Sequence, residues 1–289
     1  MIDPLLGEST VLITGANHGI GAASARAFAG QGAKVFLAYY RVPAGLLDHE
    51  LEHARESGVA GDALYRAGQQ TSGETIVDDI HASGGRAFAH ESDLENSDSA
   101  TGLFDLCEKA LGPVDILVLN HAHCVAETFD PARSAESDGE PYMISVDEMD
   151  LHHSINVRAG ALMIAEYARR FVARNARNGR VVIVSTDAAS AHVANVSYAA
   201  SKHALESYAR SAAVELGKYG ITVNVVAPGP TQTGYITSEN ESALVRHIPL
   251  GRLGTPDDIA DVIVFLASEQ ARWLTGQLIY AGGGSRMPQ

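Results

Sequence analysis

The segment that most restricts the fold of this chain lies near its N-terminus, where a short apolar stretch runs into a glycine-rich turn and then an alanine-rich stretch. Residues 11–13 (Val-Leu-Ile) have the aliphatic character of a buried strand, and residues 14–21 contain three glycines. Gly15 permits a tight turn, Gly19 lets backbone N–H groups approach an anion, and Gly21 lets the following helix pack closely on the strand. A glycine-capped turn without a ligand is the alternative, and the flanking strand and helix disfavour it. The segment predicts the start of a dinucleotide-binding unit.

Apolar stretches that alternate with helical segments continue through the rest of the chain. With 289 residues, of which 46% are hydrophobic, the chain can bury a sizeable core. We expect a Rossmann-type, doubly wound, seven-stranded parallel sheet with helices on both faces, folded as a single α/β domain. The predicted strands lie near residues 9–14, 34–40, 86–91, 115–119, 180–185, 222–227 and 278–281. Within this single domain, residues 1–289, we expect insertions near 41–70 and 124–141 and a substrate lid near 231–250.

A second group of residues, in the C-terminal half, can build a proton-transfer site. Tyr198 and Lys202 lie four residues apart, so on a helix they share one face. We expect the ammonium to stabilise the phenolate and lower the phenol pKa from about 10, so that Tyr198 can act as acid or base. Ser185 ends an apolar run, which places it at the carboxyl end of a strand. A surface tyrosine beside a lysine is the alternative, and the pair alone is weak evidence for a catalytic site. The glycine-rich turn near the N-terminus strengthens that evidence.

Together, the T-G-x-x-x-G-x-G pattern at residues 14–21 and the set Ser185, Tyr198-x-x-x-Lys202 resemble the short-chain dehydrogenase/reductase family. The resemblance covers nearly the whole chain, and residues 221–229 and 273–284 look most like the bacterial 3-oxoacyl-acyl-carrier-protein reductases. It implies an oxidoreductase that reduces a ketone or 3-oxoacyl carbonyl to a secondary alcohol, or catalyses the reverse, by hydride transfer. It identifies the substrate poorly, because many activities share this fold.

The resemblance also implies a role for each matching residue. In carbonyl reduction Tyr198 would donate a proton to the carbonyl oxygen, and Ser185 would hydrogen-bond that oxygen as charge develops. Lys202 would reach the nicotinamide ribose, and Asn156 would support a water-linked proton relay. Thr186 is the rival hydroxyl, but a residue thirteen positions before the tyrosine fits the family better than one twelve before it. The predicted catalytic set is Asn156, Ser185, Tyr198 and Lys202.

The choice of cofactor can be argued from the end of the second predicted strand. NAD enzymes usually place an acid there for the ribose 2′-hydroxyl, whereas NADP enzymes supply a cation for the 2′-phosphate. Arg41 follows this strand and no acid does, while His18 lies where NADP-using relatives often carry a basic residue. We therefore expect NADP(H) in preference to NAD(H). The residues expected to contact the cofactor are Gly15, Asn17, His18, Gly19, Ile20, Gly21, Arg41, Asp93, Leu94, Asn120, Tyr198, Lys202, Pro228, Gly229, Thr231 and Thr233.

The sequence departs from the family pattern after the fourth predicted strand. The usual Asn-Asn-Ala-Gly reads Asn-His-Ala-His at residues 120–123, so an imidazole replaces the glycine that normally lies close to the cofactor ribose. His121, His123 and Cys124, with His152 and His153 as remote candidates, raise the question of a metal site. No acidic partner is evident, so we expect no metal.

Charge and targeting signals restrict the partners and the location. The formal net charge of −14 disfavours binding of nucleic acid. It also weakens the prediction that the substrate arrives on an acyl-carrier protein, because such carriers are themselves acidic. The N-terminal residues lack a basic region and an apolar run, and no stretch reaches membrane-spanning length, so we expect a cytoplasmic protein that binds no membrane. Cys107 and Cys124 have neither disulfide nor zinc spacing, which fits a reducing compartment.

Two other functions stay open at this point. The chain could be a dinucleotide-binding regulatory protein without catalytic activity, or a lyase or epimerase that uses bound NAD transiently. The leading prediction is an enzyme with a small-molecule carbonyl or alcohol substrate that forms a homotetramer, or a homodimer, through helices beginning near residues 145 and 196. Apolar residues Leu162, Leu205 and Ala212 could form such interfaces, and burial against the home sheet explains them equally well.

Overall fold

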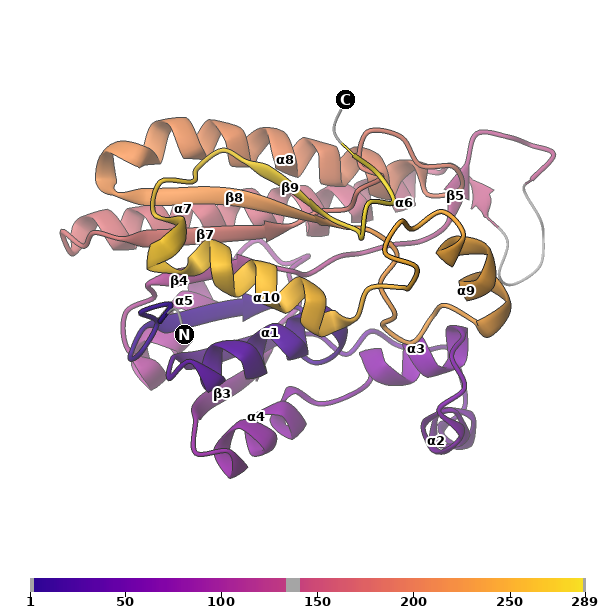
Figure 1. Ribbon diagram of the computed structural model, residues 1–289, viewed down its shortest axis with the longest axis horizontal. Coiled ribbons are helices and arrows are strands. Elements are labelled where there is room, and N and C mark those ends of the chain that lie inside the picture. The colour runs from indigo at the N-terminus through magenta and orange to yellow at the C-terminus, as the bar shows by residue number, and fades with distance from the viewer. Residues whose placement is uncertain (1–2, 134–140, 288–289) are drawn as a thin grey trace.

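A single parallel sheet forms the centre of the computed structural model, which describes residues 3–133 and 141–287 (Figure 1). The strand order is β3-β2-β1-β4-β7-β8-β9, and every neighbouring pair is parallel. The strands are β1 (Thr10–Thr14), β2 (Lys34–Tyr39), β3 (Arg86–Glu91), β4 (Ile116–Leu119), β7 (Gly179–Val184), β8 (Ile221–Pro228) and β9 (Leu278–Ala281). The predicted Rossmann-type fold is confirmed, and the order reverses between β1 and β4, where such sheets bind their ligands.

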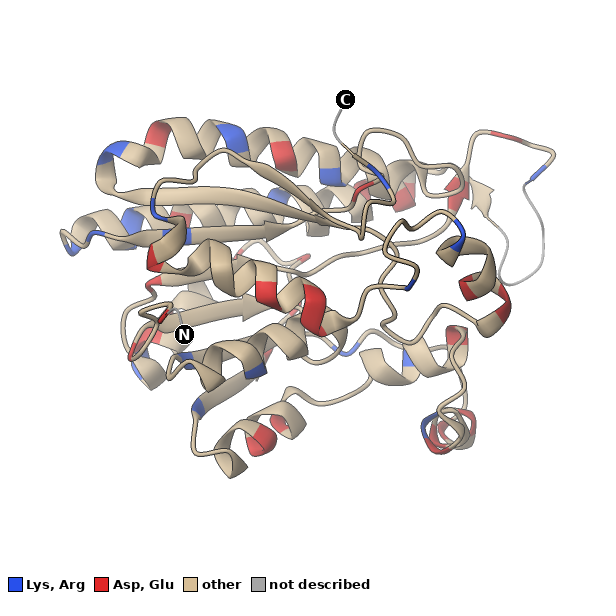
Figure 2. Ribbon diagram, viewed as in Figure 1, with Lys and Arg blue, Asp and Glu red and all other residues tan. Residues whose placement is uncertain are grey.

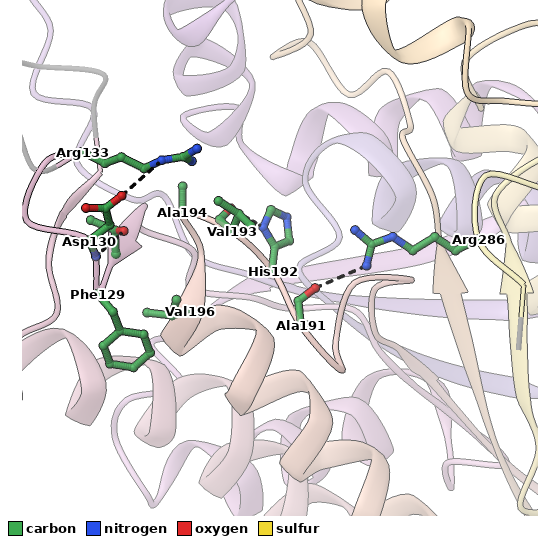
Figure 3. Close-up of a pocket in the computed structure, with 10 residues that line it drawn as sticks. Phe129, Asp130, Arg133, Ala191, His192, Val193, Ala194, Val196 and Arg286 are labelled. Carbon is green, nitrogen blue, oxygen red and sulfur yellow. Dashed lines mark hydrogen bonds and ion pairs between the residues drawn. The ribbon is translucent and has the colours of Figure 1, made fainter. Parts of the chain in front are cut away.

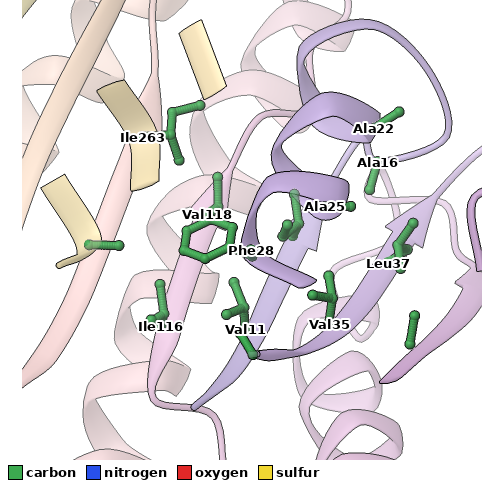
Figure 4. Close-up of a cluster of buried hydrophobic side chains, with 14 of the residues drawn as sticks. Val11, Ala16, Ala22, Ala25, Phe28, Val35, Leu37, Ile116, Val118 and Ile263 are labelled. Carbon is green, nitrogen blue, oxygen red and sulfur yellow. The ribbon is translucent and has the colours of Figure 1, made fainter. Parts of the chain in front are cut away.

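Six helices cover the two faces of the sheet. On one face lie α1 (Gly19–Gly30), α4 (Gly73–Ala82) and α10 (Pro256–Ala267), and on the other lie α5 (Ser99–Leu111), α7 (Gly160–Ala173) and α8 (Val196–Leu216). Because successive strand residues point to opposite faces, Val11 packs with Phe28 of α1, whereas Leu12 belongs to the cluster of α5 and α7 (Figure 4). Because both faces of the sheet are buried, the sequence of each strand is a nearly continuous apolar run. The strands could therefore be predicted from the sequence.

The predicted insertion near residues 41–70 folds as two short helices, α2 (Asp48–Ser57) and α3 (Asp62–Gln69). They share a small buried cluster of Ala44, Leu51, Ala54 and Ala67 that is separate from the main core. The Gly61 N–H donates to the Gly234 carbonyl oxygen at 2.8 Å. The helix pair is therefore joined to the segment that follows β8, at the carboxyl edge of the sheet.

The second predicted insertion, near 124–141, contains a two-stranded parallel pair that the sequence did not indicate, β5 (Glu127–Thr128) and β6 (Tyr142–Met143). Residues 134–140 of this insertion lie outside the described residues. After β6 come α6 (Val146–His152) and a π-helical turn, η1 (His153–Ala159), which continues into α7. Single π-helical turns within α-helices occur often at functional sites.

The predicted lid near 231–250 contains α9 (Ser238–Val245) and its own apolar cluster of Ile236, Ile248 and Leu253. Two short 3₁₀ turns, η2 (Gly217–Tyr219) and η3 (Glu269–Ala271), complete the structure. Charged residues lie mainly on helices and loops, with acidic ones visible on α2, α9 and α10 (Figure 2).

Of the residues proposed for subunit contacts, Leu205 is only 2% exposed and packs in the home core, whereas Leu162 is 40% exposed. The homotetramer and the cytoplasmic location stay predictions. Among the described helices, none combines the length and the apolar character that a bilayer crossing requires.

Candidate active site

The glycine turn after β1 has the geometry that a dinucleotide phosphate requires. Gly15 and Gly19 adopt left-handed φ values of +62° and +52°, which favour glycine. A Cβ atom added to Gly21 would lie 2.6 Å from Asn120 Nδ2 and would overlap the Gly15 carbonyl oxygen. Helix α1 begins at Gly19 without a side-chain cap, so its first N–H groups remain available to an anion. This cradle fits the pyrophosphate of a dinucleotide.

Two residues of the turn hold the inserted helices rather than extend the cradle. Asn17 Nδ2 donates to the carbonyl oxygens of Gln69 at 3.0 Å and Thr71 at 2.9 Å. The His18 ring meets the edge of Tyr65 with 5.6 Å between centroids, and burial lowers the pKa of His18 to about 4. His18 is therefore neutral at pH 7. In this structure His18 contributes no positive charge, and its contact with a 2′-phosphate stays a prediction.

Arg41 makes an ion pair that the sequence did not indicate. Its Nη2 lies 2.7 Å from Oε2 of Glu91, and its Nε donates to both oxygens of the same carboxylate at 3.0 and 3.1 Å. Glu91 ends β3 and pairs in register with Tyr39 of β2. The acid missing from the end of β2 is thus supplied by the neighbouring strand, and the Arg41 side chain is still 49% exposed.

The other predicted cofactor residues follow the carboxyl ends of several strands. Asn120 Nδ2 donates to the Gly15 carbonyl oxygen at 2.8 Å, which ties the end of β4 to the glycine turn. A Cβ placed at Gly19 would lie 3.2 Å from the Thr233 methyl group, so the loop after β8 also reaches the turn. The remaining predicted cofactor residues also lie near this edge of the sheet. Ile20 lies in the glycine turn, Asp93 and Leu94 follow β3, and Pro228, Gly229 and Thr231 lie at and after the end of β8.

Tyr198 and Lys202 lie on the same face of α8, as predicted from their spacing. Lys202 is buried, and its Nζ donates to the carbonyl oxygens of Val184 at 2.9 Å and His121 at 3.2 Å, which leaves one of its three N–H donors. Burial lowers the pKa of Lys202 to about 8. The Nζ atom lies 5.9 Å from the centroid of the Tyr198 ring.

The predicted effect of this lysine on the tyrosine differs from what the structure shows. Burial raises the pKa of Tyr198, and the nearby Cys124 acts in the same direction. Desolvation is the largest influence on this pKa, because a phenolate in an apolar site loses its hydration. At neutral pH Tyr198 is a protonated phenol, which suits a proton donor better than a base.

The hydroxyl of Ser185 is engaged by a residue that the sequence analysis missed. Ser185 Oγ donates to Oε1 of Glu206 at 2.6 Å, and both residues are buried. Glu206 follows Lys202 by one helical turn, and this i, i+4 spacing was the signal that could have revealed it. The next hydroxyl, of the half-buried Thr186, accepts from the Ala188 N–H at 3.3 Å, and no acceptor among the described residues takes its proton.

Asn156 lies in η1 with every side-chain hydrogen-bonding group satisfied. Its Oδ1 accepts from the His123 N–H at 2.7 Å, and its Nδ2 donates to the His123 carbonyl oxygen at 2.8 Å and to Ser201 Oγ at 2.9 Å. These contacts fix the loop after β4 against α8, which carries Tyr198 and Lys202. The role of Asn156 in a water-linked proton relay stays a prediction.

The two unusual histidines after β4 have separate environments. His121 is buried between the Thr14 hydroxyl, 2.7 Å from Nδ1, and the Ile155 carbonyl oxygen, 3.0 Å from Nε2, and burial lowers its pKa to about 3. It is thus a neutral core residue. His123 Nε2 lies 2.7 Å from Oε2 of Glu148. The statement that no acid accompanies these histidines is wrong, because Glu148 lies on α6, 25 residues further along the chain.

An open cavity of about 560 Å³ lies beside the N-terminus of α8 (Figure 3). Phe129 and Val193 contribute apolar surface, and Arg133 and Arg286 approach it from opposite sides. Val196, two residues before Tyr198, also lines the cavity. The cavity therefore lies next to the first turn of the helix that carries Tyr198.

Comparisons with known proteins identify the family of the chain. Residues 51–286 match the family model described as enoyl-(acyl carrier protein) reductase. The chain is 34% identical to an L-rhamnose 1-dehydrogenase (NAD(P)(+)) of Azotobacter vinelandii over 287 residues, 97% of each chain. It is 32% identical to an oxidoreductase of Bacillus subtilis over 282 residues, 96% of each. A short chain dehydrogenase of Burkholderia cenocepacia, solved in complex with NADP, superposes with a TM-score of 0.76 at 27% identity, covering 97% of this chain and 98% of that one.

Proposed function

Because the chain belongs to the short-chain dehydrogenase/reductase family and is an NAD(P)-dependent oxidoreductase of alcohol and carbonyl groups, we propose that it reduces a ketone or 3-oxoacyl carbonyl with NADP(H). One observation carries the proposal: α8 presents Tyr198 beside a buried Lys202 whose Nζ contacts Val184 and His121. These contacts lie at the ends of β7 and β4, the edge of the sheet that also carries the glycine turn. A regulatory protein without chemistry and a lyase are disfavoured by the family assignment.

The protonation states of Tyr198 and Lys202 indicate which step each residue performs. The nicotinamide supplies or accepts the hydride when bound in the crevice. Tyr198 gives its proton to the carbonyl oxygen, since its raised pKa keeps the phenol protonated at neutral pH. Lys202 holds the loop after β4 through the His121 carbonyl oxygen and uses its remaining N–H donor for the nicotinamide ribose.

We propose that Thr186, rather than Ser185, donates the hydrogen bond that stabilises the developing charge on the carbonyl oxygen. A hydroxyl has one proton, and that of Ser185 is committed to Glu206. The Thr186 proton has no acceptor among the described residues, and Thr186 directly follows Ser185 past the end of β7. In this proposal Ser185 holds α8 through Glu206, and the catalytic role predicted for Ser185 is the alternative that the experiment tests.

Replacing Thr186 by Val is therefore expected to lower kcat by about 100-fold, the usual cost of losing one hydrogen-bond donor to a developing oxyanion. Replacing Ser185 by Ala is the matched comparison, and it should lower the melting temperature more than kcat, because it leaves the buried Glu206 carboxylate without its donor. Steady-state kinetics and thermal unfolding of both variants distinguish the roles. A 100-fold loss confined to Ser185→Ala would return the oxyanion role to Ser185.

The proposed preference for NADP(H) depends on Arg41. Its guanidinium is half-exposed, and Arg41 lies two residues past the end of β2, so it can exchange Glu91 for a ribose 2′-phosphate. Glu91 opposes this preference, because its carboxylate repels a phosphate unless Arg41 lies between them. The name of the Azotobacter vinelandii relative includes both dinucleotides, and the Burkholderia cenocepacia structure contains NADP.

With a ketone or a 3-oxoacyl thioester, kcat/KM for NADPH is expected to exceed that for NADH in the wild-type protein. Arg41→Ala should reduce the NADPH value by about tenfold and leave the NADH value nearly unchanged, since only the 2′-phosphate loses a charge-assisted contact. Arg272→Ala, which removes an exposed arginine next to η3 that pairs with Glu269, is a matched control. Oxidation of both cofactors at equal rates, unaffected by Arg41→Ala, would contradict the preference while leaving the reaction class intact.

We further propose that residues 231–250 act as the substrate lid and that α2 and α3 form a cover over the dinucleotide. Two contacts join these parts: the Gly61 N–H donates to the Gly234 carbonyl oxygen, and the rings of Tyr65 and Tyr235 lie 5.8 Å apart in an edge arrangement. The Tyr65 ring also meets His18 in the glycine turn. Aromatic contacts thus connect the phosphate cradle, the cover and the lid.

A further inference from the structure

Three side chains close to the catalytic residues, yet without a part in the proposed reaction, converge at the start of α6. His123 comes from the loop after β4, and Glu148 and His152 come from successive turns of α6. We propose that these three residues bind a divalent transition metal ion, with Zn²⁺ the best match, in a site that positions the loop after β4.

The donor atoms are already close together. One candidate ligand atom from each residue lies within 4.8 Å of the other two, and His123 Nε2 lies 2.7 Å from Glu148 Oε2. The imidazole rings of His123 and His152 are 4.6 Å apart between centroids. Metal–ligand bonds of about 2.0–2.2 Å place the donors of a tetrahedral zinc site about 3.3 Å apart, so a small outward movement of His123 and Glu148 would admit the ion.

The helix fixes the orientation of the His152 ring. His152 Nδ1 lies 2.7 Å from the Glu148 carbonyl oxygen, one turn earlier, and the ring is buried with its side chain 1% exposed. The same Nδ1 lies 3.9 Å from Glu148 Oε2. Nε2 accepts a long 3.4 Å contact from the Val125 N–H, and an ion bound at Nε2 would replace this contact. A metal-binding histidine commonly donates its other nitrogen to a backbone carbonyl in this way.

A second, independent observation is a buried carboxylate that lacks a partner. Glu127 of β5 is completely buried, its Oε1 accepts from the Ser145 N–H at 3.1 Å, and its Oε2 has no hydrogen-bond partner among the described residues. Ser145 links this carboxylate to the cluster, because its Oγ accepts from the Glu148 N–H at 3.3 Å. A buried carboxylate oxygen without a partner is unfavourable unless a cation compensates it.

The charges around the cluster call for a cation. Glu127 and Glu148 carry two negative charges when ionised, and neither makes an ion pair with Lys or Arg among residues 3–133 and 141–287. Neutral imidazoles cannot balance these charges, whereas one divalent ion would do so. Two histidines and one glutamate form a donor set common for zinc, with a fourth position open to water.

The location suggests a positioning role rather than a catalytic one. The backbone of His123 exchanges two hydrogen bonds with the Asn156 side chain, and Lys202 binds the carbonyl oxygen of His121 in the same loop. An ion on the His123 ring would fix this loop to α6, and through it the residues that surround the nicotinamide ribose.

The test is the binding of Zn²⁺ to tag-free protein from which metal has been removed with a chelator. We expect one saturable site in isothermal titration calorimetry and a rise in melting temperature of about 5 °C at a hundredfold excess over the dissociation constant. Glu148→Gln, which keeps the shape and removes the charge, should weaken binding by about 100-fold, and His123→Gln should do the same. His153→Ala is the matched control, because this exposed histidine adjoins His152 without belonging to the cluster.

Cobalt provides a structural readout that does not depend on activity. Co²⁺ bound to this donor set should give the intense visible absorption of a tetrahedral complex in the wild-type protein and in His153→Ala, and none in Glu148→Gln. Circular dichroism establishes that each variant is folded. The proposal is overturned if no saturable Zn²⁺ site is found, if Glu148→Gln and His123→Gln bind as the wild type does, or if His153→Ala weakens binding equally.

Discussion

Replacing Tyr198 by Phe is expected to lower kcat by about 1000-fold, while dinucleotide affinity stays within about threefold of the wild-type value. The substitution removes one oxygen and keeps the ring, so the packing on α8 is preserved. The loss is large because the neighbouring His121 cannot replace the phenol: it is neutral, with a pKa of about 3, and Thr14 and Ile155 engage both of its ring nitrogens.

The matched control is Tyr208→Phe, which makes the same chemical change at an exposed position of the same helix. It should leave kcat unchanged. Turnover is followed by NADPH absorbance, and dinucleotide binding by quenching of intrinsic fluorescence. A Tyr198→Phe protein that binds the dinucleotide and turns over at the wild-type rate would remove the basis of the proposed mechanism.

Replacing Gly21 by Ala is expected to weaken dinucleotide binding by about 100-fold and to lower the free energy of unfolding by about 1–3 kcal/mol. The new methyl group would overlap the Gly15 carbonyl oxygen and lie 2.9 Å from the Ala16 Cα atom. These are backbone atoms, so the strain moves the turn itself. The N–H groups that bind the pyrophosphate belong to that turn and move with it.

Gly30→Ala provides the control at the other end of α1, because a Cβ there meets nothing within 4 Å. It should raise stability by about 0.5–1 kcal/mol, since alanine loses less backbone freedom in a helix, and leave dinucleotide affinity unchanged. Urea unfolding and fluorescence titration measure both quantities. Equal affinities in the Gly21→Ala and wild-type proteins would show that the turn does not hold the phosphates.

The sheet was predictable because its strands are buried on both faces. Each observed strand of the main sheet differs from its predicted range by at most one residue at either end. A continuous apolar run such as residues 181–184 has no polar face to place in water, so its burial follows from composition alone. The strand order then follows from alternation of strands and helices with right-handed crossovers.

The partners of the site residues were less predictable, because they come from distant parts of the chain. Arg41 was read as a free cation, yet it pairs with Glu91, 50 residues away. His123 was read as lacking an acid, yet Glu148 lies beside it. The direction of the Tyr198 pKa shift was also misjudged, because helical spacing reveals the neighbouring charge and says nothing of how completely the ring is desolvated. Such quantities depend on tertiary placement that no local pattern encodes.

The inserted helices α2 and α3 are held by a cluster of only four buried residues, apart from the two main cores. The other contacts of the two helices are a few hydrogen bonds and aromatic edges. We therefore expect α2 and α3 to open more readily than the sheet unfolds. If they cover the dinucleotide as proposed, this opening is a step at which release of the spent coenzyme can limit turnover.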